Sequence, residues 1–281
     1  MYVYSARGHL LRQLTLADST SHLLGLRFHP STGALLVIDF GGAKVLDVDP
    51  ETGASRVFMT LPAAPYPEFG FGLNDLTFDR SGGVYVSDSF QGVVWKTGPS
   101  GGEATVWVDS ELLRTRGVPP FGANGLRFNN DESAMFVANT GNNTIVKVPI
   151  IDGSAGMPGI FVNGVHGADG LLIDANNNLW VAANQGDEIV VVDPTGRAIS
   201  KLGDFDGVTR SGRPVHLLFP ASIRFSGRNL LVTNLALDLR LFDPSFATVD
   251  SQWAHMVSRY TVAKIHARIR GFEDEGEDRE D

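Results

Sequence analysis

Short apolar runs separated by polar turns recur along the whole chain at intervals of 45–52 residues. Each copy is an apolar run, a turn rich in Gly, Asn, Asp or Ser, and a second apolar run, which is the pattern of a β-hairpin. The apolar runs hardly alternate with polar residues, as expected of strands buried on both faces. The five copies begin at Leu24, Asn74, Asn124, Asp169 and Ala221.

Two further strands follow the hairpin in most copies. Third strands are predicted at residues 43–50, 92–99, 144–150 and 188–194, and more polar fourth strands at 55–61, 103–110 and 198–205. Four antiparallel strands in each repeat of this length describe a β-propeller blade. A β-sandwich or two small barrels would not explain one motif at a near-constant interval. We therefore predict an all-β propeller of about six blades.

The two ends of the chain indicate one incomplete blade. Residues 2–16 resemble a third and fourth strand without an inner hairpin, and residues 259–269 fit an outer strand of the Ala221 blade. The ring either closes irregularly or lacks an upstream hairpin. The predicted domain organisation is one propeller, residues 1–268, followed by an acidic, disordered tail, residues 269–281.

Composition narrows the function classes. The 281 residues carry a net charge of −9 and contain no cysteine, which excludes thiol nucleophiles and zinc–thiolate sites. The negative charge argues against a nucleic-acid partner, and no apolar run is long enough for a membrane helix. The first residues lack a signal-peptide pattern. We expect a cytoplasmic protein, or an exported one if an upstream segment is missing; the oligomeric state stays open.

The first residue of each blade's first strand is expected at one mouth of the central channel. Asn74, Asn124 and Asp169 occupy this opening position in three blades, where Leu24 and Ala221 show that the fold also accepts apolar or small residues. Three polar side chains there are not a folding requirement, because burying them costs free energy unless they are satisfied. A carboxylate and two carboxamides suit a hard divalent cation.

Other polar residues on the same mouth are candidates for substrate contact or proton transfer. His166 precedes Asp169 by three residues and is a candidate general base or substrate ligand. Glu68 lies in a Pro- and Phe-rich loop before Asn74, and His216 lies before Ala221. The second strands end at Asp39, Asp88, Asn139, Asn184 and Asn234, where closing the next turn is the favoured interpretation over a second layer around the site.

The strings GLND, GANGLRF and GADGLLIDANNNLWVAA resemble the gluconolactonase/regucalcin-like (senescence marker protein) family, and the similarity runs from about Tyr2 to Ile265. The resemblance implies a six-bladed propeller with one divalent cation and hydrolysis of lactones, esters or organophosphates. It places Asn124 and Asp169 on metal-ligand positions and Asn74 on a metal- or substrate-contacting position. Ca²⁺ is the first choice of cation, with Zn²⁺, Mn²⁺ and Mg²⁺ as alternatives.

The chain departs from this family at one ligand. The family's first metal ligand is a glutamate that opens the first blade in a Glu-Gly or Glu-Ser context, and no such motif is present. The leading hypothesis is a metal-dependent hydrolase of lactones or related esters, with Asp169 or His166 as base and Asn74 and Glu68 in substrate binding. No serine nucleophile on a Gly-x-Ser-x-Gly elbow, which needs a strand–turn–helix context, is expected. The alternatives are a non-enzymatic binding module and an inactive or truncated family member.

Overall fold

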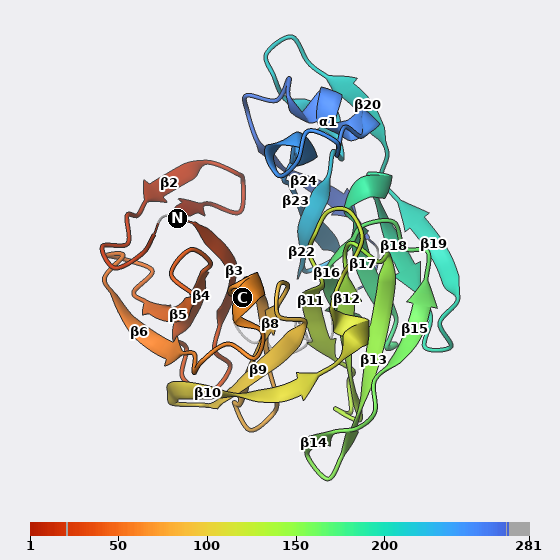
Figure 1. Ribbon diagram of the computed structural model, residues 1–281. Coiled ribbons are helices and arrows are strands. Elements are labelled where there is room, and N and C mark those ends of the chain that lie inside the picture. The colour runs from red at the N-terminus through yellow and green to blue at the C-terminus, as the bar shows by residue number, and fades with distance from the viewer. Residues whose placement is uncertain (21, 268, 270–281) are drawn as a thin grey trace. The chain divides into compact units, whose positions relative to one another are not determined.

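The computed structural model describes residues 1–20, 22–267 and 269, and the chain divides into two compact units, Met1–Ser110 and Glu111–Asp281 (Figure 1). Strands dominate both units, and the described residues contain a single α-helix, α1 (Val249–Ala254). No helix in the described part of the chain has the length and apolar character needed to cross a membrane. The predicted acidic tail lies outside the described residues, apart from Ile269.

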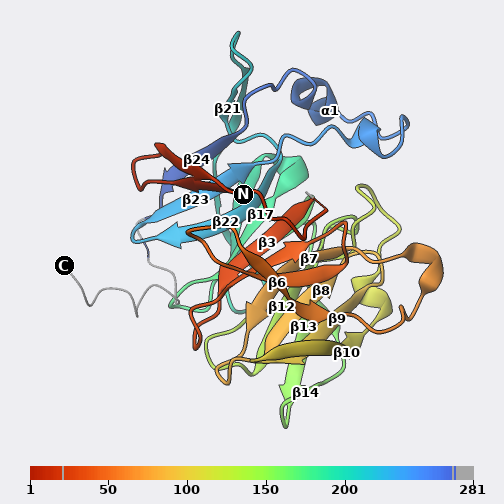
Figure 2. The same ribbon diagram turned by 90° about the vertical axis from the view of Figure 1, so that its left-hand side faces the viewer.

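Two predicted repeats form an eight-stranded sheet in the first unit, in the order β3-β4-β5-β6-β10-β9-β8-β7. Its strands are β3 (Leu23–Phe28), β4 (Leu35–Asp39), β5 (Lys44–Val48), β6 (Ser55–Thr60), β7 (Leu73–Phe78), β8 (Val84–Asp88), β9 (Val93–Gly98) and β10 (Gly101–Asp109). The outer strands β6 and β10 pair in parallel through Met59 and Gly102, so two four-stranded blades meet at their outer edges (Figure 2). The predicted third and fourth strands are confirmed in both blades.

The predicted outer strands at the N-terminus form a separate two-stranded sheet, β1 (Tyr2–Tyr4) and β2 (Leu10–Gln13). Apolar side chains on one face of β3–β6, such as Ile38, pack with side chains of the β7–β10 blade, such as Trp95. The opposite face contributes a smaller cluster to which Leu16 belongs. Leu26 and Phe28 on β3 stay exposed.

The three remaining repeats form separate sheets in the second unit. The first contains β11 (Ala123–Phe128), β12 (Ala134–Asn139), β13 (Thr144–Ile151), β14 (Ser154–Ala155) and β15 (Gly159–Asn163); the second contains β16 (Ala168–Ile173), β17 (Leu179–Ala183), β18 (Glu188–Val192) and β19 (Ala198–Leu202); the third contains β22 (Pro220–Ser226), β23 (Asn229–Asn234) and β24 (Thr261–His266). Strand β24 pairs with β23, as predicted for the C-terminal segment.

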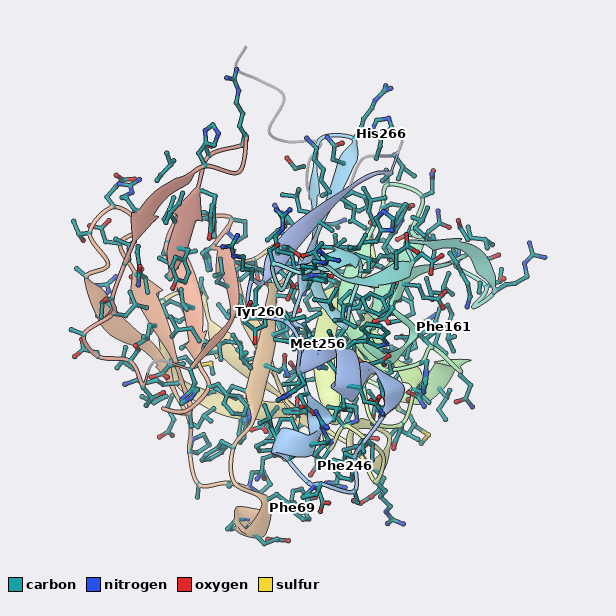
Figure 3. The ribbon with its side chains drawn as sticks, turned by 90° about the horizontal axis from the view of Figure 1, so that it is seen from above. Phe69, Phe161, Phe246, Met256, Tyr260 and His266 are labelled. Carbon is teal, nitrogen blue, oxygen red and sulfur yellow. The ribbon has the colours of Figure 1, made fainter. Side chains whose placement is uncertain are left out.

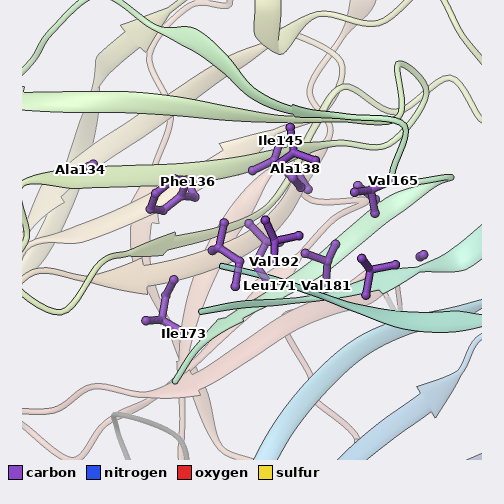
Figure 4. Close-up of a cluster of buried hydrophobic side chains, with 14 residues drawn as sticks. Ala134, Phe136, Ala138, Ile145, Val165, Leu171, Ile173, Val181 and Val192 are labelled. Atoms are coloured by element: carbon purple, nitrogen blue, oxygen red, sulfur yellow. The ribbon is translucent and has the colours of Figure 1, made fainter. Parts of the chain in front are cut away.

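The β16–β19 sheet is buried on both faces, which explains why its sequence does not alternate. Val181 packs in the cluster shared with the β11–β15 sheet, which also holds Phe136 (Figure 4). Trp180, the neighbour of Val181, points to the opposite face and packs edge-on against Phe225 of the β22 sheet. Successive side chains in a strand point to opposite faces, so both positions must be apolar when both faces are covered.

Two insertions in the second unit were not anticipated from the sequence. A hairpin, β20 (Phe205–Val208) and β21 (Pro214–His216), precedes β22. Residues 235–260, between β23 and β24, contain the 3-10 turn η4 (Leu239–Leu241) and helix α1. Phe246, Met256 and Tyr260 of this second insertion are labelled in Figure 3.

Candidate functional site

The opening positions of neighbouring first strands lie side by side, because a glycine follows the opening residue where two strands meet. A Cβ atom on Gly170 of β16 would lie 2.5 Å from the carbonyl oxygen of Ala221, the opening residue of β22. Gly125 of β11 approaches the carbonyl oxygen of Asp169 in the same way. The Asn-Gly-Leu and Asp-Gly-Leu motifs therefore allow Asn124, Asp169 and Ala221 to align on adjacent backbones.

Asn124 is held by a hydrogen-bond chain that runs from β11 to β16. Its side-chain Nδ2 donates to Thr140 Oγ1 at 2.8 Å, and Thr140 Oγ1 donates to the carbonyl oxygen of Ala168 at 2.7 Å. Both Asn124 and Thr140 are buried. Because the amide nitrogen is directed toward Thr140, the Asn124 side-chain oxygen is available as an acceptor, and no donor contacts it among the described residues.

Asp169 follows Ala168 directly and is held by the end of its own second strand. Asn184 Nδ2 donates to Asp169 Oδ2 at 3.1 Å. Asn184 is fully buried, and its Oδ1 has no hydrogen-bond partner among the described residues. This oxygen lies over Gly167, where any side chain would clash with it. The donated hydrogen bond fixes the orientation of the Asp169 carboxyl group.

Asn74 repeats this arrangement within the first unit. Its Nδ2 donates to Ser89 Oγ at 3.2 Å, and Ser89 directly follows β8 as Thr140 follows β12. Gly25 on β3 contacts the Asn74 carbonyl oxygen, which aligns Leu24 with Asn74 as the repeat predicts. In each polar copy, a residue 15 or 16 positions later therefore fixes the side chain at the opening position.

The other predicted site residues lie on loops. His166 is exposed on the loop between β15 and β16. Glu68 is exposed on the 3-10 turn η1 (Pro67–Phe69) of the first unit. His216 is exposed at the end of β21, where its Nδ1 lies 3.1 Å from Asp206 Oδ2 of the same hairpin.

Four of the five residues at the ends of second strands bind backbone groups of the segment that precedes the first strand of the same blade, and three of them also bind the turn that follows. Asp88 accepts hydrogen bonds from the backbone N–H groups of Gly72 and Gln91, and Asn139 Nδ2 donates to two carbonyl oxygens of residues 112 and 114. Asp39 and Asn234 make similar contacts. Asn184 differs, because its amide group binds the carboxylate of Asp169.

Two half-buried carboxyl groups lie on the same side of the second unit and were not singled out by sequence. Asp187 ends the turn after β17, where its Oδ1 accepts a hydrogen bond of 2.7 Å from the backbone N–H of Phe219. Burial, together with the negative charges of Asp250 and Asp204, raises the pKa of Asp187 to about 7. Burial also raises the pKa of Asp250. Only three-dimensional contacts reveal these groups: Asp187 ends a turn in which other repeats have Ala43, Gly92 and Asn143, and Asp250 lies in an insertion.

The donor chemistry at the opening positions consists of hard oxygens. Asn124 offers a side-chain oxygen whose amide nitrogen is bound elsewhere, and Asp169 offers a carboxylate. No group of three or more His, Cys, Asp or Glu side chains arranged to hold a metal occurs among the described residues. By donor type, the Asn124 carboxamide oxygen and the Asp169 carboxylate of the second unit would suit a hard divalent cation.

Comparison with known proteins adds a family and a fold. The model of the SMP-30/gluconolactonase/LRE-like region matches residues 45–203. The lactonase drp35 of Staphylococcus saprophyticus is 25% identical over 179 residues, which cover 61% of this chain and 49% of that protein. The lactonase drp35 of Staphylococcus epidermidis is 30% identical over 137 residues, which cover 46% and 41%. The chain thus matches less than half the length of these relatives.

Solved structures with the same fold include proteins of different activities. A luciferin-regenerating enzyme has a TM-score of 0.64 at 18% identity and covers 91% of this chain and 81% of that one. A chain of a nidogen/laminin complex has a TM-score of 0.58 at 15% identity, with coverage of 89% and 82%. Virginiamycin B lyase from Staphylococcus aureus has a TM-score of 0.56 at 15% identity, with coverage of 82% and 69%. The predicted all-β propeller class is confirmed.

Proposed function

The chain belongs to the SMP-30/gluconolactonase/LRE-like family, and from this premise we propose that it hydrolyses lactones or related esters. The supporting observation is the pair of polar opening residues on adjacent strands, Asn124 and Asp169. Asn124 donates a hydrogen bond to the buried Thr140, and Asp169 accepts one from the buried Asn184. Apolar residues at the equivalent positions of other blades show that the fold itself does not need them. Two curated relatives that match part of the chain are lactonases.

A divalent cation, Ca²⁺ first, with Zn²⁺, Mn²⁺ or Mg²⁺ as alternatives, would be held by Asn124 and Asp169 with Asn74 as the predicted third ligand, and would polarise the substrate carbonyl as a Lewis acid. Thr140 accepts from the Asn124 amide nitrogen and so leaves the amide oxygen as the acceptor, and Asn184 donates to the Asp169 carboxyl group. This arrangement orients both groups before substrate binds, which lowers the cost of reaching the reactive geometry.

The reaction needs a group that takes a proton from water. A water oxygen adds to the lactone carbonyl carbon, its proton passes to a base, the ring C–O bond breaks, and the departing oxygen takes up a proton to give a hydroxy acid. Asp169 and His166 are the predicted bases, because both lie at the start of β16. Asn74 and Glu68, described within the first unit, remain predicted substrate-binding residues.

Steady-state hydrolysis of a γ-lactone, with Ca²⁺, Mn²⁺ or Zn²⁺ added, tests the proposal. We expect Asp169→Asn to lower kcat/KM at least about 100-fold, as loss of an essential charged group does. Asp131→Asn is the control, because Asp131 is exposed and binds Ser133 within its own turn. Equal activity in the wild type and Asp169→Asn would refute the proposed site.

A binding module without catalytic activity is the second candidate. The same fold occurs in a nidogen/laminin complex, and the glutamate implied by the family resemblance is absent from the sequence. The prediction under this reading is that no lactone is turned over and that calorimetry detects no cation binding, while a protein partner binds. A measurable lactonase activity that depends on Asp169 would exclude it.

A further inference from the structure

Residues 235–260, which we call the cap, replace a tight turn. In the four other repeats the second and third strands are joined by residues 40–43, 89–92, 140–143 and 184–187. In the last sheet Asn234 pairs with both Pro220 and Thr261, so the cap leaves and returns at the end where β22 begins. The cap therefore lies at the end of the second unit that carries the opening residues.

The cap packs against the β20–β21 hairpin. Ala236 and Ala254 of the cap share a small core with Leu218 and Phe205, and the rings of Trp253 and Phe205 meet edge-to-face at 5.6 Å. The backbone N–H groups of residues 258 and 259 both donate to the carbonyl oxygen of Gly212 at 3.0 Å. Figures 1 and 2 show the hairpin and α1 together at one end of the second unit.

A charged contact stiffens the cap internally. Asp238 accepts a hydrogen bond from the backbone N–H of Arg240 at the start of η4, and the Arg240 guanidinium returns to Asp238 Oδ2 at 2.6 Å. The same guanidinium donates to the carbonyl oxygen of Ser251 in α1 at 3.2 Å. The Arg240 hydrogen bonds lower the pKa of Asp238 to about 2. This contact ties η4 to α1.

The cap reaches the loop that leads to Asn124. The ring of Phe242 packs edge-to-face on Phe121 at 5.5 Å, and Phe121 precedes Asn124 by three residues. The carboxyl group of Asp250 in the cap also lies within electrostatic range of Asp187, in the turn after β17. The cap therefore lies beside the beginning of β11, at the end of the second unit where Asn124 stands.

The part of the cap that contacts Phe121 presents apolar surface. Phe242 remains 47% exposed despite its contact with Phe121, and Leu241 beside it is 78% exposed. Exposed apolar side chains beside a polar catalytic pair are typical of small-molecule sites, where a few polar groups fix orientation and apolar walls supply affinity. An apolar arm of a bound substrate would remove this surface from water.

We propose that the cap forms one wall of the substrate site and that Phe242, backed by Phe121, selects lactones carrying an alkyl or aryl arm. This inference rests on the proposed function. It names the substrate class by chemistry: an uncharged lactone ring that meets the opening residues and an apolar substituent that meets the aromatic pair. The insertion would then explain why a turn that is short elsewhere is long in this sheet.

Hydrolysis of paired substrates tests the preference. We compare γ-butyrolactone with the same ring carrying a hexyl group and expect the wild type to show at least about tenfold higher kcat/KM for the hexyl compound. Phe242→Ala should reduce this ratio about tenfold, mainly through KM, whereas Phe242→Leu should retain most of it. Ile151→Ala is the control, because Ile151 is an exposed apolar residue on the β13–β14 hairpin.

Binding of unreactive lactams, measured by calorimetry, separates this inference from the proposed activity. The hexyl-substituted lactam should bind the wild type about tenfold more tightly than Phe242→Ala, with Ile151→Ala like the wild type. If the hexyl-substituted lactam bound as expected but neither lactone were hydrolysed, the lactonase proposal would be refuted and the cap inference would stand. Hydrolysis with no preference between the two lactones, or equal lactam affinity in the wild type and Phe242→Ala, would overturn the cap inference alone.

Discussion

Glycine next to the opening residue sets how closely neighbouring first strands approach. A Cβ atom at Gly125 would overlap the carbonyl oxygen of Asp169, which belongs to backbone and cannot rotate away. We predict that Gly125→Ala lowers the free energy of unfolding by about 1–3 kcal/mol or more, as overpacking does. Gly159→Ala is the control, because a Cβ there meets nothing within 4 Å. Denaturant unfolding measures both, and equal midpoints would contradict the close approach.

The hydroxyl of Thr140 has a double role, because it accepts from Asn124 and donates to the Ala168 carbonyl. Thr140→Val keeps the shape but leaves two buried polar groups unpaired. We predict a loss of about 1–3 kcal/mol in unfolding free energy and at least about a tenfold loss in kcat/KM for a lactone. Thr140→Ser, which keeps the hydroxyl group, should retain both the unfolding free energy and the kcat/KM of the wild type. If Thr140→Val lost only stability, with unchanged kcat/KM, the orienting role of Thr140 would be wrong.

Asp187 predicts a specific pH dependence of stability. Its pKa is about 7 in the folded chain, raised first by burial, against an ordinary value of 3.8. Between about pH 4 and 7 the folded state therefore holds a proton that the unfolded state releases, so this group's contribution to stability falls as pH rises through 7. Asp187→Asn mimics the protonated form, since a side-chain oxygen still accepts from Phe219.

The expected result is a pair of melting curves that differ only at higher pH. The free energy of unfolding of Asp187→Asn should equal that of the wild type near pH 4 and exceed it by about 1–2 kcal/mol at pH 8. This difference is smaller than the full pKa shift would give, because solvent screens the partly exposed carboxylate. Circular dichroism melts from pH 4 to 8 measure the difference. A constant offset across this range would mean that Asp187 is ionised in the folded state at every pH.

Individual elements show how far sequence patterns reach. The hairpins, the third strands and the C-terminal strand β24 follow from apolar runs and turn residues, because each blade repeats the same local chemistry. The opening positions follow from the same register of the repeats, and the glycines beside them explain how neighbouring first strands can lie so close together. Even the two-sided burial of Trp180 and Val181 is readable from the absence of alternation.

The parts that sequence did not predict are those that occur once. The β20–β21 hairpin and the cap have no counterpart in other repeats, so no register could reveal them. Thr140 and Ser89 escaped notice because a hydroxyl residue after a strand usually closes a turn, and only the contacts with Asn124 and Asn74 assign them another role. Strand β15 was missed because its sequence, GIFVN, follows the extra hairpin at residues 150–155.

The cap also predicts an effect that belongs to an element. Arg240 connects η4 to α1 through Asp238 and the Ser251 carbonyl. We predict that Arg240→Ala weakens the hexyl-lactone preference several-fold through KM, because the segment that carries Phe242 loses its tie to α1. Arg56→Ala is the control, since Arg56 forms an exposed ion pair with Asp47 in the first unit. An unchanged preference in Arg240→Ala would show that Phe242 is positioned without this contact.

At the scale of the whole molecule, a net charge of −9 and a single carboxylate among the predicted ligands make opposite contributions to cation binding. The overall charge attracts cations weakly and without specificity, and this attraction is screened by salt. A site with one carboxylate and amide oxygens should bind Ca²⁺ only in the range of 10⁻⁴–10⁻³ M, as sites of low ligand charge do. Specific binding of Ca²⁺ at the predicted ligands is therefore distinguished from non-specific attraction by removing the carboxylate in a variant and by adding salt, which screens the overall charge.

Thermal unfolding of the full chain makes that separation. A ligand that binds only the folded state stabilises it by RT ln(1 + [L]/Kd), which is about 1.4 kcal/mol at ten times Kd. For a chain of this size, 10 mM Ca²⁺ should raise Tm by roughly 2–4 °C in 0.15 M salt. Asp169→Asn should abolish the rise, whereas Asp131→Asn, which changes net charge equally, should retain it. The same rise in all three proteins would mean that the cation acts on overall charge, and the predicted ligands Asn74, Asn124 and Asp169 would lose their support.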